Sequence, residues 1–412
     1  MSTTANVVSF RNWLAEHGGG FHRQAQFVEV PSGFSILAVS DLPADTTVVE
    51  CPFDLAITEE LAQRCLLQIL DLKEEVEISG WTERQWISLY LCCHWIFEKS
   101  RSLHLNVLSH LLHYAYVKTL PSASKLRTPL HFTRLELELF QGTNLYGAAL
   151  DRERVWRAEW SQCRNALSKA NPEWGSKFSW EYYLTASTYL SSRAFPSSLL
   201  SPAPSLLSSP DTKPVLLPGI DALNHGRKQP VSWVVSYADS DVTSRKKPKI
   251  SLVLHSPFTQ GQELLNNYGA KPNSELILGY GFALSQNPDD TIVLKIGGSN
   301  ERWEIGRSAR GAEGLWNEIL TSVQQTPEFS SYEDQLDAAS TMLDMLQALV
   351  DRLPPDRDDR RVNMRPEVAI MLDYYVEGQR DILESLMNFA HEKARLAIDQ
   401  ARAEGIEIVL ED

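Results

Sequence analysis

LLPGIDALNHG, residues 216–226, is the stretch of sequence that decides the fold. An apolar, strand-like run ends here in three polar residues, Asp221, Asn224 and His225. Polar side chains at the end of a strand commonly serve a ligand. The same residues could instead form a turn, in which an Asp or Asn side chain bonds its own backbone. The segment therefore indicates a function only together with a partner elsewhere in the chain.

That partner is ELLNNYGAKPNSELILGYGF, residues 263–282. Tyr268 stands where a predicted strand ends, Asn273 is placed to cap a short helix, and that helix ends at Gly281. A tyrosine at a strand exit is often a packing residue, and Gly269 after it is often part of a turn. The two segments in one chain are far more specific than either is alone.

The two segments resemble the motifs of the SET-domain methyltransferases. The patterns D-x-x-N-H and N-Y-G-x-x-x-N-x-E-x-x-x-x-Y-G-F resemble the group that includes the plant Rubisco large-subunit lysine methyltransferase, fungal ribosomal-protein lysine methyltransferases and the animal actin-histidine methyltransferase. Three more segments carry the resemblance: SGFSILAVSDLPADT (32–46), LELELFQGTNL (135–145) and FSWEYYLTASTYLSSRAF (178–195). The C-terminal helices are similar to the family's substrate-binding domain only by composition and position.

The resemblance implies S-adenosylmethionine as the cofactor and Tyr268 as the catalytic residue. It implies the following cofactor-binding residues: Ser32, Gly33, Phe34, Arg193, Asp221, Asn224, His225, Tyr280, Gly281 and Phe282. The guanidinium of Arg193 suits the cofactor's carboxylate, which it can bond with two N–H groups; the alternative is an ordinary ion pair. The amide of Asn224 suits the amino-acid end of the cofactor, and the backbone around His225 suits the adenine edge.

One residue departs from the family pattern. The usual Gly-x-Gly near the first strands reads Gly33-Phe34-Ser35 here. Because a serine cannot reach glycine-only backbone angles without strain, we expect the cofactor contact at Ser35 to differ from the family's. The cysteine-rich zinc segments that flank many histone-directed SET domains have no counterpart in this sequence, so a chromatin substrate is less favoured.

Methyl transfer to an amine is an in-line displacement, so the site must mainly hold the nucleophile, the methyl group and the leaving sulfur in line. A lysine nucleophile must also lose its proton, which at pH 7 costs roughly 4 to 5 kcal/mol for a pKa near 10.4. An aromatic channel beside the sulfonium lowers that cost, because desolvation and a nearby positive charge both disfavour the ammonium form. We expect Tyr268 to form a wall of this channel.

Three functions remain open from the sequence. The first is a protein lysine N-methyltransferase that acts on a non-histone protein, with a ribosomal protein as the leading candidate by resemblance. The second keeps the enzyme class but methylates a histidine. The third is a catalytically inert SET-like interaction module, whose C-terminal helices bind a partner. The presence of Arg193, Asn224 and Tyr268 together favours an active enzyme.

The chain of 412 residues is long enough for two or three packed units. Strands are expected at 27–30, 35–39, 47–49, 231–237 and 250–255, and apolar residues recur at helical spacing elsewhere. We predict an α+β fold: a SET-type β-fold of short strands interrupted by a helical insert, followed by an all-α C-terminal domain. The expected segments are the first part of the SET core (1–57), the insert (58–195), a Ser/Pro-rich loop (196–215), the second part of the core with the active site (216–295) and a helical substrate-binding-like domain (296–412).

The composition, with 43% hydrophobic and 22% charged residues, is typical of a soluble globular protein. The formal net charge of −14 argues against a protein that binds nucleic acid by neutralising phosphates, and it suits a basic protein partner. Five cysteines without a C-x-x-C pair indicate no disulfide framework and no metal site, and they favour a reducing compartment. Since the sequence has no long apolar run and no secretory signal pattern, we expect a cytoplasmic protein that does not bind membranes and that can also act in the nucleus. We expect a monomer.

Overall fold

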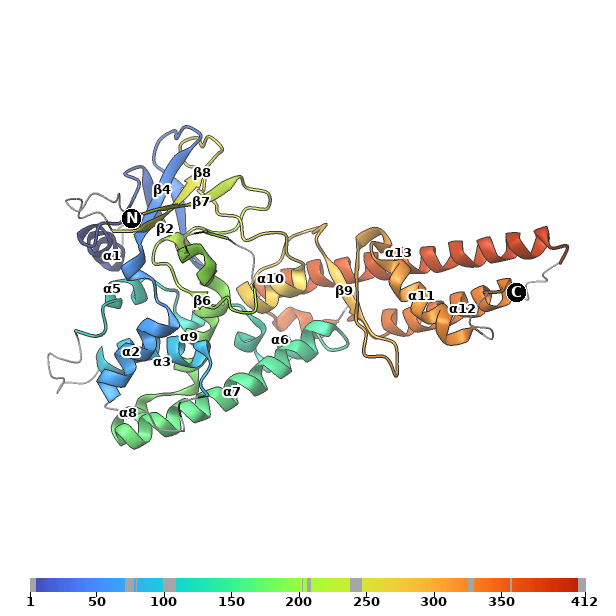
Figure 1. Cartoon of the computed structure of the whole chain (residues 1–412), viewed down its shortest axis with the longest axis horizontal. Helices are drawn as coiled ribbons and strands as arrows, with labels where there is room; N and C mark the ends of the chain where they lie inside the picture. Colours follow the sequence, from blue (N-terminus) through green and yellow to red (C-terminus); the bar gives the residue numbers. More distant parts are fainter. Residues whose placement is uncertain are drawn as a thin grey trace. The chain divides into compact units, whose positions relative to one another are not determined.

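The structure is a computed structural model, which describes residues 5–406 except 71–77, 79, 99–108, 202, 206–208, 238–246, 325–329 and 356–357. The chain forms two compact units (Figure 1). The first unit comprises Met1–Leu126 and Arg152–Ala270, and the second comprises Arg127–Asp151 and Lys271–Asp412. This division into two units does not test the five segments expected from the sequence, which remain predictions.

The strands of the first unit form small antiparallel sheets. One sheet has the order β1 (Gly20–Phe21), β4 (Thr46–Pro52), β8 (Lys249–Leu254) and β7 (Val231–Ser236), and Figure 1 shows β4, β7 and β8 side by side. A hairpin joins β2 (Ala25–Val30) to β3 (Gly33–Ala38), and β5 (Phe195–Pro196) pairs with β6 (Pro214–Val215). The strands expected at 27–30, 35–39, 47–49, 231–237 and 250–255 are confirmed, with shifted ends.

Helices make up the rest of the first unit. They are α1 (Ala5–Glu16), α2 (Glu59–Leu70), α3 (Glu83–Glu98), α5 (Tyr114–Val117), α8 (Pro172–Lys177) and α9 (Trp180–Arg193), with the short helices η1 (Phe53–Leu55), η2 (Ala123–Lys125), η4 (Ser197–Leu200) and η5 (Ile220–Ala222). The hydroxyls of Ser88 in α3 and Ser187 in α9 lie 3.1 Å apart, so small polar side chains let these two helices approach closely. The Ser179 hydroxyl caps α9 by accepting from the Tyr182 N–H (3.2 Å). Arg193 is therefore the last residue of a capped and packed helix.

The second unit is mainly helical. It contains η3 (Pro129–His131), α6 (Arg134–Glu138), α10 (Asn273–Tyr280), β9 (Thr291–Leu294), β10 (Trp303–Gly306), η6 (Arg307–Ala309), α11 (Ala312–Val323), α12 (Tyr332–Val350), η7 (Asp359–Asn363) and α13 (Pro366–Ala403). The helix α7 (Asn144–Ala170) begins in this unit and ends in the first. In α13 the apolar residues at helical spacing, among them Val368, Leu372 and Ile382, are buried against the unit's core. The helical pattern expected for the C-terminal residues is confirmed, but the expectation of an all-α domain over 296–412 is corrected, because β10 lies in this range and pairs antiparallel with β9.

Three further properties concern the described residues alone. No helix among them is both long and apolar enough to cross a membrane. In the same part of the chain, no group of three or more His, Cys, Asp or Glu side chains is placed to hold a metal ion. All five cysteines are buried free thiols.

Candidate active site

The first motif segment and residues 263–270 of the second lie side by side in the first unit. The Asn266 N–H donates to the Asn224 carbonyl (2.8 Å), and the Gly226 N–H donates to the Asn266 carbonyl (2.7 Å), which forms a short parallel bridge. The bridge brings His225 beside Tyr268. Two segments that are about forty residues apart in the sequence therefore form one site, and their mutual backbone hydrogen bonds fix the position of each.

The expectation that Asp221 and Tyr268 stand at the ends of strands is wrong. The strand β6 ends at Val215, and Asp221 lies in the short helix η5, which follows Gly219. Gly219 has a φ of 92°, and a Cβ there would lie 3.1 Å from Val49, so both the backbone angle and the space require glycine. Tyr268 follows isolated bridges, not a continuous strand. The tight turn at Gly219 directs the Asp221 carboxylate into the protein.

Asp221 is buried and its carboxylate is held by three donors. The Tyr116 hydroxyl donates to Oδ2 (2.7 Å), the Gly219 N–H donates to Oδ1 (3.1 Å), and Arg193 Nη1 lies 3.4 Å from Oδ2. Burial raises the pKa of Asp221, while Arg193, Tyr116 and the Gly219 N–H oppose this rise by favouring the carboxylate. The carboxylate is thus engaged by the protein itself.

Arg193 is fixed on one side and open on the other. Its Nη1 donates to the Asp221 backbone carbonyl (2.9 Å) and faces the Asp221 carboxylate, while a quarter of the side chain is exposed. Burial alone would lower the pKa of this guanidinium, but Asp221 and Tyr116 raise it above its usual value. Toward the described residues, Nε and Nη2 make no hydrogen bond. These N–H groups can bind an anion.

The amide nitrogen of Asn224, unlike Nε and Nη2 of Arg193, is fully engaged by protein groups. Its amide Nδ2 donates to the Glu263 carboxylate (2.8 Å), to the Ser35 hydroxyl (3.2 Å) and to the Phe34 carbonyl (3.4 Å). Ser35 lies within the extended strand β3 and does not have a positive φ, so the strain expected from replacing a glycine does not arise. The glycine-only angle belongs to Gly33, whose φ is 139° and which closes the β2–β3 hairpin after Ser32.

Tyr268 packs on His225 and is bonded at both ends. The two rings lie 5.1 Å apart between centroids at an angle of 26°, and the Tyr268 N–H donates to His225 Nδ1 (3.0 Å). This bond requires Nδ1 to be an acceptor, so a neutral His225 carries its proton on Nε2. The Tyr268 hydroxyl donates to the Leu223 carbonyl (2.9 Å). The phenol therefore has a fixed position beside the D-x-x-N-H segment.

Three of the expected cofactor-binding residues, Tyr280, Gly281 and Phe282, belong to the second unit, and their role stays a prediction. Gly281 ends α10 with a φ of 82°, as expected from the sequence. The expectation that Asn273 caps this helix is wrong. Asn273 is the first residue of α10. Its Oδ1 accepts from the Leu284 N–H (2.8 Å), and its Nδ2 donates to the Leu284 carbonyl (2.9 Å).

Comparison with solved structures identifies the type of fold. The SET domain of LSMT bound to lysine and AdoHcy has a TM-score of 0.71 and 17% identity, over 97% of this chain and 94% of that one. Rubisco LSMT bound to AdoMet has a TM-score of 0.69 and 16% identity, over 99% of this chain and 98% of that one. At these identities the likeness is one of fold, and it confirms the predicted α+β architecture of SET type. No family model matches the chain.

Curated relatives agree with this fold. Ribosomal lysine N-methyltransferase set10 of Schizosaccharomyces pombe is 30% identical over 287 residues, which are 68% of this chain and 46% of set10. Ribosomal lysine N-methyltransferase 1 of Saccharomyces cerevisiae is 35% identical over 119 residues, 29% of this chain and 18% of that protein. The chain therefore has a SET-type fold and is similar in sequence to these lysine methyltransferases. It spans about half or less of the length of these two relatives.

Three residues contribute to the site although the sequence alone does not indicate their roles. Tyr116 supports Asp221, but it lies in a helix of only four residues that gives no periodic signal. Glu263 bonds Asn224, although it is the first residue of the second motif segment. Ser35 differs from the family glycine, but its sequence context does not indicate a partner. Their partners are between 39 and 189 residues away in the sequence, so only the fold reveals them.

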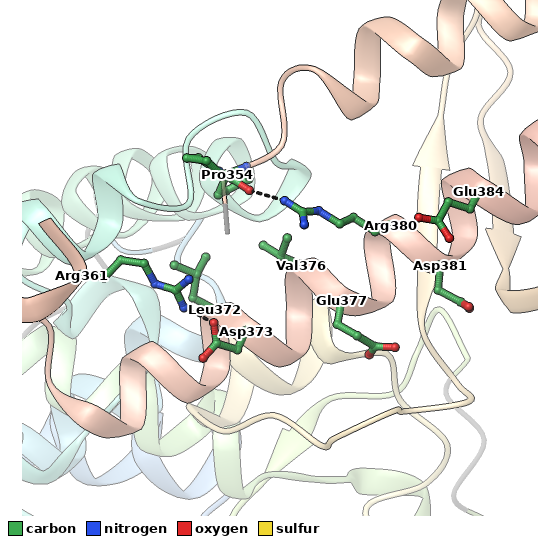
Figure 2. A pocket seen from close by; sticks show the side chains of 10 residues that line it. Pro354, Arg361, Leu372, Asp373, Val376, Glu377, Arg380, Asp381 and Glu384 are labelled. Atoms are coloured by element: carbon green, nitrogen blue, oxygen red, sulfur yellow. Dashed lines mark hydrogen bonds and ion pairs between the residues drawn. The ribbon is translucent and has the colours of Figure 1, made fainter. Parts of the chain in front are cut away.

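The second unit of the SET-domain chain contains a pocket of about 480 Å³ beside α13 (Figure 2). Four carboxylates line it: Asp373, Glu377, Asp381 and Glu384. Asp373 pairs with Arg361, and both Glu377 and Asp381 pair with Arg307. Figure 2 shows Arg380 reaching the Pro354 carbonyl (2.8 Å). Three of the four carboxylates in this pocket therefore already have an arginine partner within the unit itself.

Proposed function

We propose that this chain is an S-adenosylmethionine-dependent protein lysine N-methyltransferase. The observation that carries the proposal is the convergence of the two motifs, with Tyr268 stacked on His225 and Arg193 fixed at the turn that holds Asp221. The relatives support it, since set10 is named a ribosomal lysine N-methyltransferase and LSMT has been solved with lysine and AdoHcy bound.

The described residues fit the amino-acid end of S-adenosylmethionine, which carries a carboxylate and an ammonium group. Arg193 offers Nε and Nη2 to a carboxylate, because its Nη1 alone is engaged by Asp221. Asn224 offers Oδ1 to an ammonium group, because its Nδ2 is already bonded. In this proposal Asp221 acts by holding Arg193. Ser32, Gly33, Phe34 and His225, which also belong to the first unit, complete the proposed cofactor site.

The bound cofactor would supply a methyl group to a neutral lysine amine, whose lone pair forms the C–N bond as the C–S bond breaks, with the amine proton lost to solvent. Tyr268 donates its hydroxyl proton to Leu223, so its oxygen meets any further partner as an acceptor. Such an oxygen can accept an N–H of the amine and orient the lone pair. Its ring face can stabilise the cationic product by about 0.5 to 2 kcal/mol. A tyrosinate base is disfavoured, because a phenol has a pKa of about 10.

The substitution Tyr268→Phe tests this role. It keeps the ring on His225 and removes the oriented oxygen, so we expect AdoHcy to bind almost normally and kcat to fall by about 100-fold. Tyr237→Phe is the control, because the Tyr237 hydroxyl also donates to a backbone carbonyl, that of Ser201, on an exposed part of the first unit. We expect Tyr237→Phe to retain its turnover. Unchanged kcat in Tyr268→Phe would refute the catalytic role.

For the substrate we propose a basic ribosomal protein. The names of the relatives support this class, and the net charge of −14 favours encounter with a basic partner. We further propose that the protein acts as a monomer in the cytoplasm, with access to the nucleus.

Labelling with tritiated S-adenosylmethionine tests both the activity and the substrate. The protein is incubated with lysate from cells that lack it, and the labelled band is identified by mass spectrometry. We expect methyllysine in a ribosomal protein. Methylhistidine would show that the acceptor is a histidine, and a failure to bind S-adenosylmethionine in calorimetry would favour an inert interaction module.

A further inference from the structure

The Asn224 side chain is held in one orientation by acceptors alone. Two of its three Nδ2 partners are the Glu263 carboxylate (2.8 Å) and the Phe34 carbonyl (3.4 Å), and both accept a hydrogen bond from Nδ2. The third is the Ser35 hydroxyl (3.2 Å). An exchange of nitrogen and oxygen in this amide would set Oδ1 against a carboxylate and a carbonyl, which is repulsive. Oδ1 must therefore point away from these three groups.

The fold explains why Ser35 and Glu263 meet at Asn224. Residues 262–264 run antiparallel beside β3, with the Leu264 N–H donating to the Ile36 carbonyl (2.7 Å) and the Ala38 N–H to the Gln262 carbonyl (2.9 Å). Glu263 is paired with Leu37 across this ladder. Because side chains alternate along a strand, Ser35 lies on the same face as Leu37 and hence as Glu263. The hydrogen-bonded backbones of these two extended segments therefore fix the positions of both side chains.

We infer that Ser35 and Glu263 are positioning residues for Asn224, which they orient so that Oδ1 receives the ammonium group at the amino-acid end of the cofactor. This inference rests on the proposed function, because it requires a ligand with an α-ammonium group. It gives Ser35 a role that the family's glycine cannot have, since glycine offers no hydroxyl. Ser35 is 8% exposed and Asn224 half-buried, so the hydrogen bond between them is shielded from water.

Calorimetry with two ligands tests the inference on the full chain. AdoHcy carries the α-ammonium group, and 5′-methylthioadenosine lacks the whole amino-acid end. We expect Ser35→Ala and Glu263→Ala to weaken AdoHcy by about 3- to 10-fold, the loss of one hydrogen bond, and to leave 5′-methylthioadenosine unchanged. Ser35→Thr keeps the hydroxyl and should bind AdoHcy as the parent does. Glu263→Gln keeps an acceptor oxygen and should do the same.

Ser251→Ala is the matched control. Ser251 is also 8% exposed, lies in a strand of the same unit, and donates its hydroxyl to a glutamate, Glu50 (3.2 Å). We expect this variant to bind both ligands normally.

Each other outcome overturns the inference. Equal weakening of the two ligands in Ser35→Ala would mean a general structural role, and no weakening would mean no role. A loss in Glu263→Gln as large as in Glu263→Ala would mean that the charge of Glu263, and not its hold on Asn224, matters to the ligand. If the parent chain binds neither ligand, the proposed function fails as well, which is distinguishable from a failure confined to the variants.

Discussion

Arg193 in the first unit and Arg307 in the second each face a buried aspartate, but they differ in how many of their N–H groups the protein uses. Arg307 donates to the Asn287 carbonyl (2.9 Å), approaches Asp290 (3.3 Å), and pairs with Glu377 (2.7 Å) and Asp381 (3.1 Å). Arg193 uses Nη1 alone among the described residues. An arginine that serves the fold is saturated by protein groups, whereas one that can serve a ligand is anchored at one nitrogen and left open at the others.

The same contrast separates the pocket beside α13 from the candidate active site. In the pocket beside α13, Arg361 pairs with Asp373 (Figure 2), and Arg307 pairs with both Glu377 and Asp381. At the motif segments, Arg193 retains donors and Asn224 retains an acceptor. The presence of charged residues in a concave surface is thus a weaker sign of a ligand site than the presence of held but incompletely bonded groups.

Conservative arginine variants should separate the two roles. Lysine keeps the charge in Arg193→Lys but loses the planar fork, so we expect AdoHcy affinity to fall by about 10- to 100-fold with little change in unfolding free energy. Arg307→Lys should bind AdoHcy normally and lose about 1 to 3 kcal/mol of stability, because several of its bonds disappear. Calorimetry and urea unfolding measure the two effects. Comparable losses of affinity in both variants would contradict the contrast.

Acid should destabilise the first unit before the second. Burial lowers the pKa of His94 to about 4 and that of His113 to about 3, from a usual 6.5. A lowered folded pKa gives stability that is fully present above pH 6.5 and is lost as the pH falls below it. Each histidine therefore costs about 1.4 kcal/mol per pH unit in this range.

In the second unit two groups oppose each other. Burial lowers the pKa of His131 to about 4, which again removes stability below pH 6.5. Burial also raises the pKa of Asp290 to about 6, so its contribution is lost as the pH rises through 6 and recovered as the pH falls toward 3.8. The two contributions nearly cancel between about pH 6 and pH 4.5.

Hydrogen exchange at pH 7 and pH 5, corrected for the intrinsic rates, measures this difference. We expect the opening free energy of α3 to fall more than that of α13. In His94→Phe the fall in α3 should be smaller, because the variant removes one titrating group. The described residues offer His94 Nε2 no hydrogen-bond partner, so the variant loses no bond there. Equal pH dependence in the two helices would contradict the assignment.

The sequence predicted those parts of the structure that depend on local patterns. The strand β3 and the helices α9 and α13 follow from alternating or helical spacing of apolar residues, and Gly281 ends α10 because of its backbone freedom. The direction of a polar side chain is a different matter, because it depends on partners far away in the sequence. Asp221 faces Tyr116 and Arg193, and Ser35 faces Asn224, through contacts that no local pattern encodes. The motif thus located the site, while the fold determined which atoms remain available to a ligand.

Two buried tyrosines give the smallest and most specific test of the contrast. The hydroxyls of Tyr116 and Tyr183 each donate to a buried carboxylate, Asp221 (2.7 Å) in one case and Glu159 (2.9 Å) in the other. Each Tyr→Phe substitution removes one charge-assisted bond and should cost about 1.5 to 3 kcal/mol of stability. Only Tyr116→Phe loosens the carboxylate that holds Arg193, so it alone should weaken AdoHcy, by about 3-fold, a loss that Tyr183→Phe should not show in the same calorimetric titration. If both variants lose stability and neither loses affinity, Asp221 serves the fold as Asp290 does, and Arg193 does not need its anchor to receive a ligand.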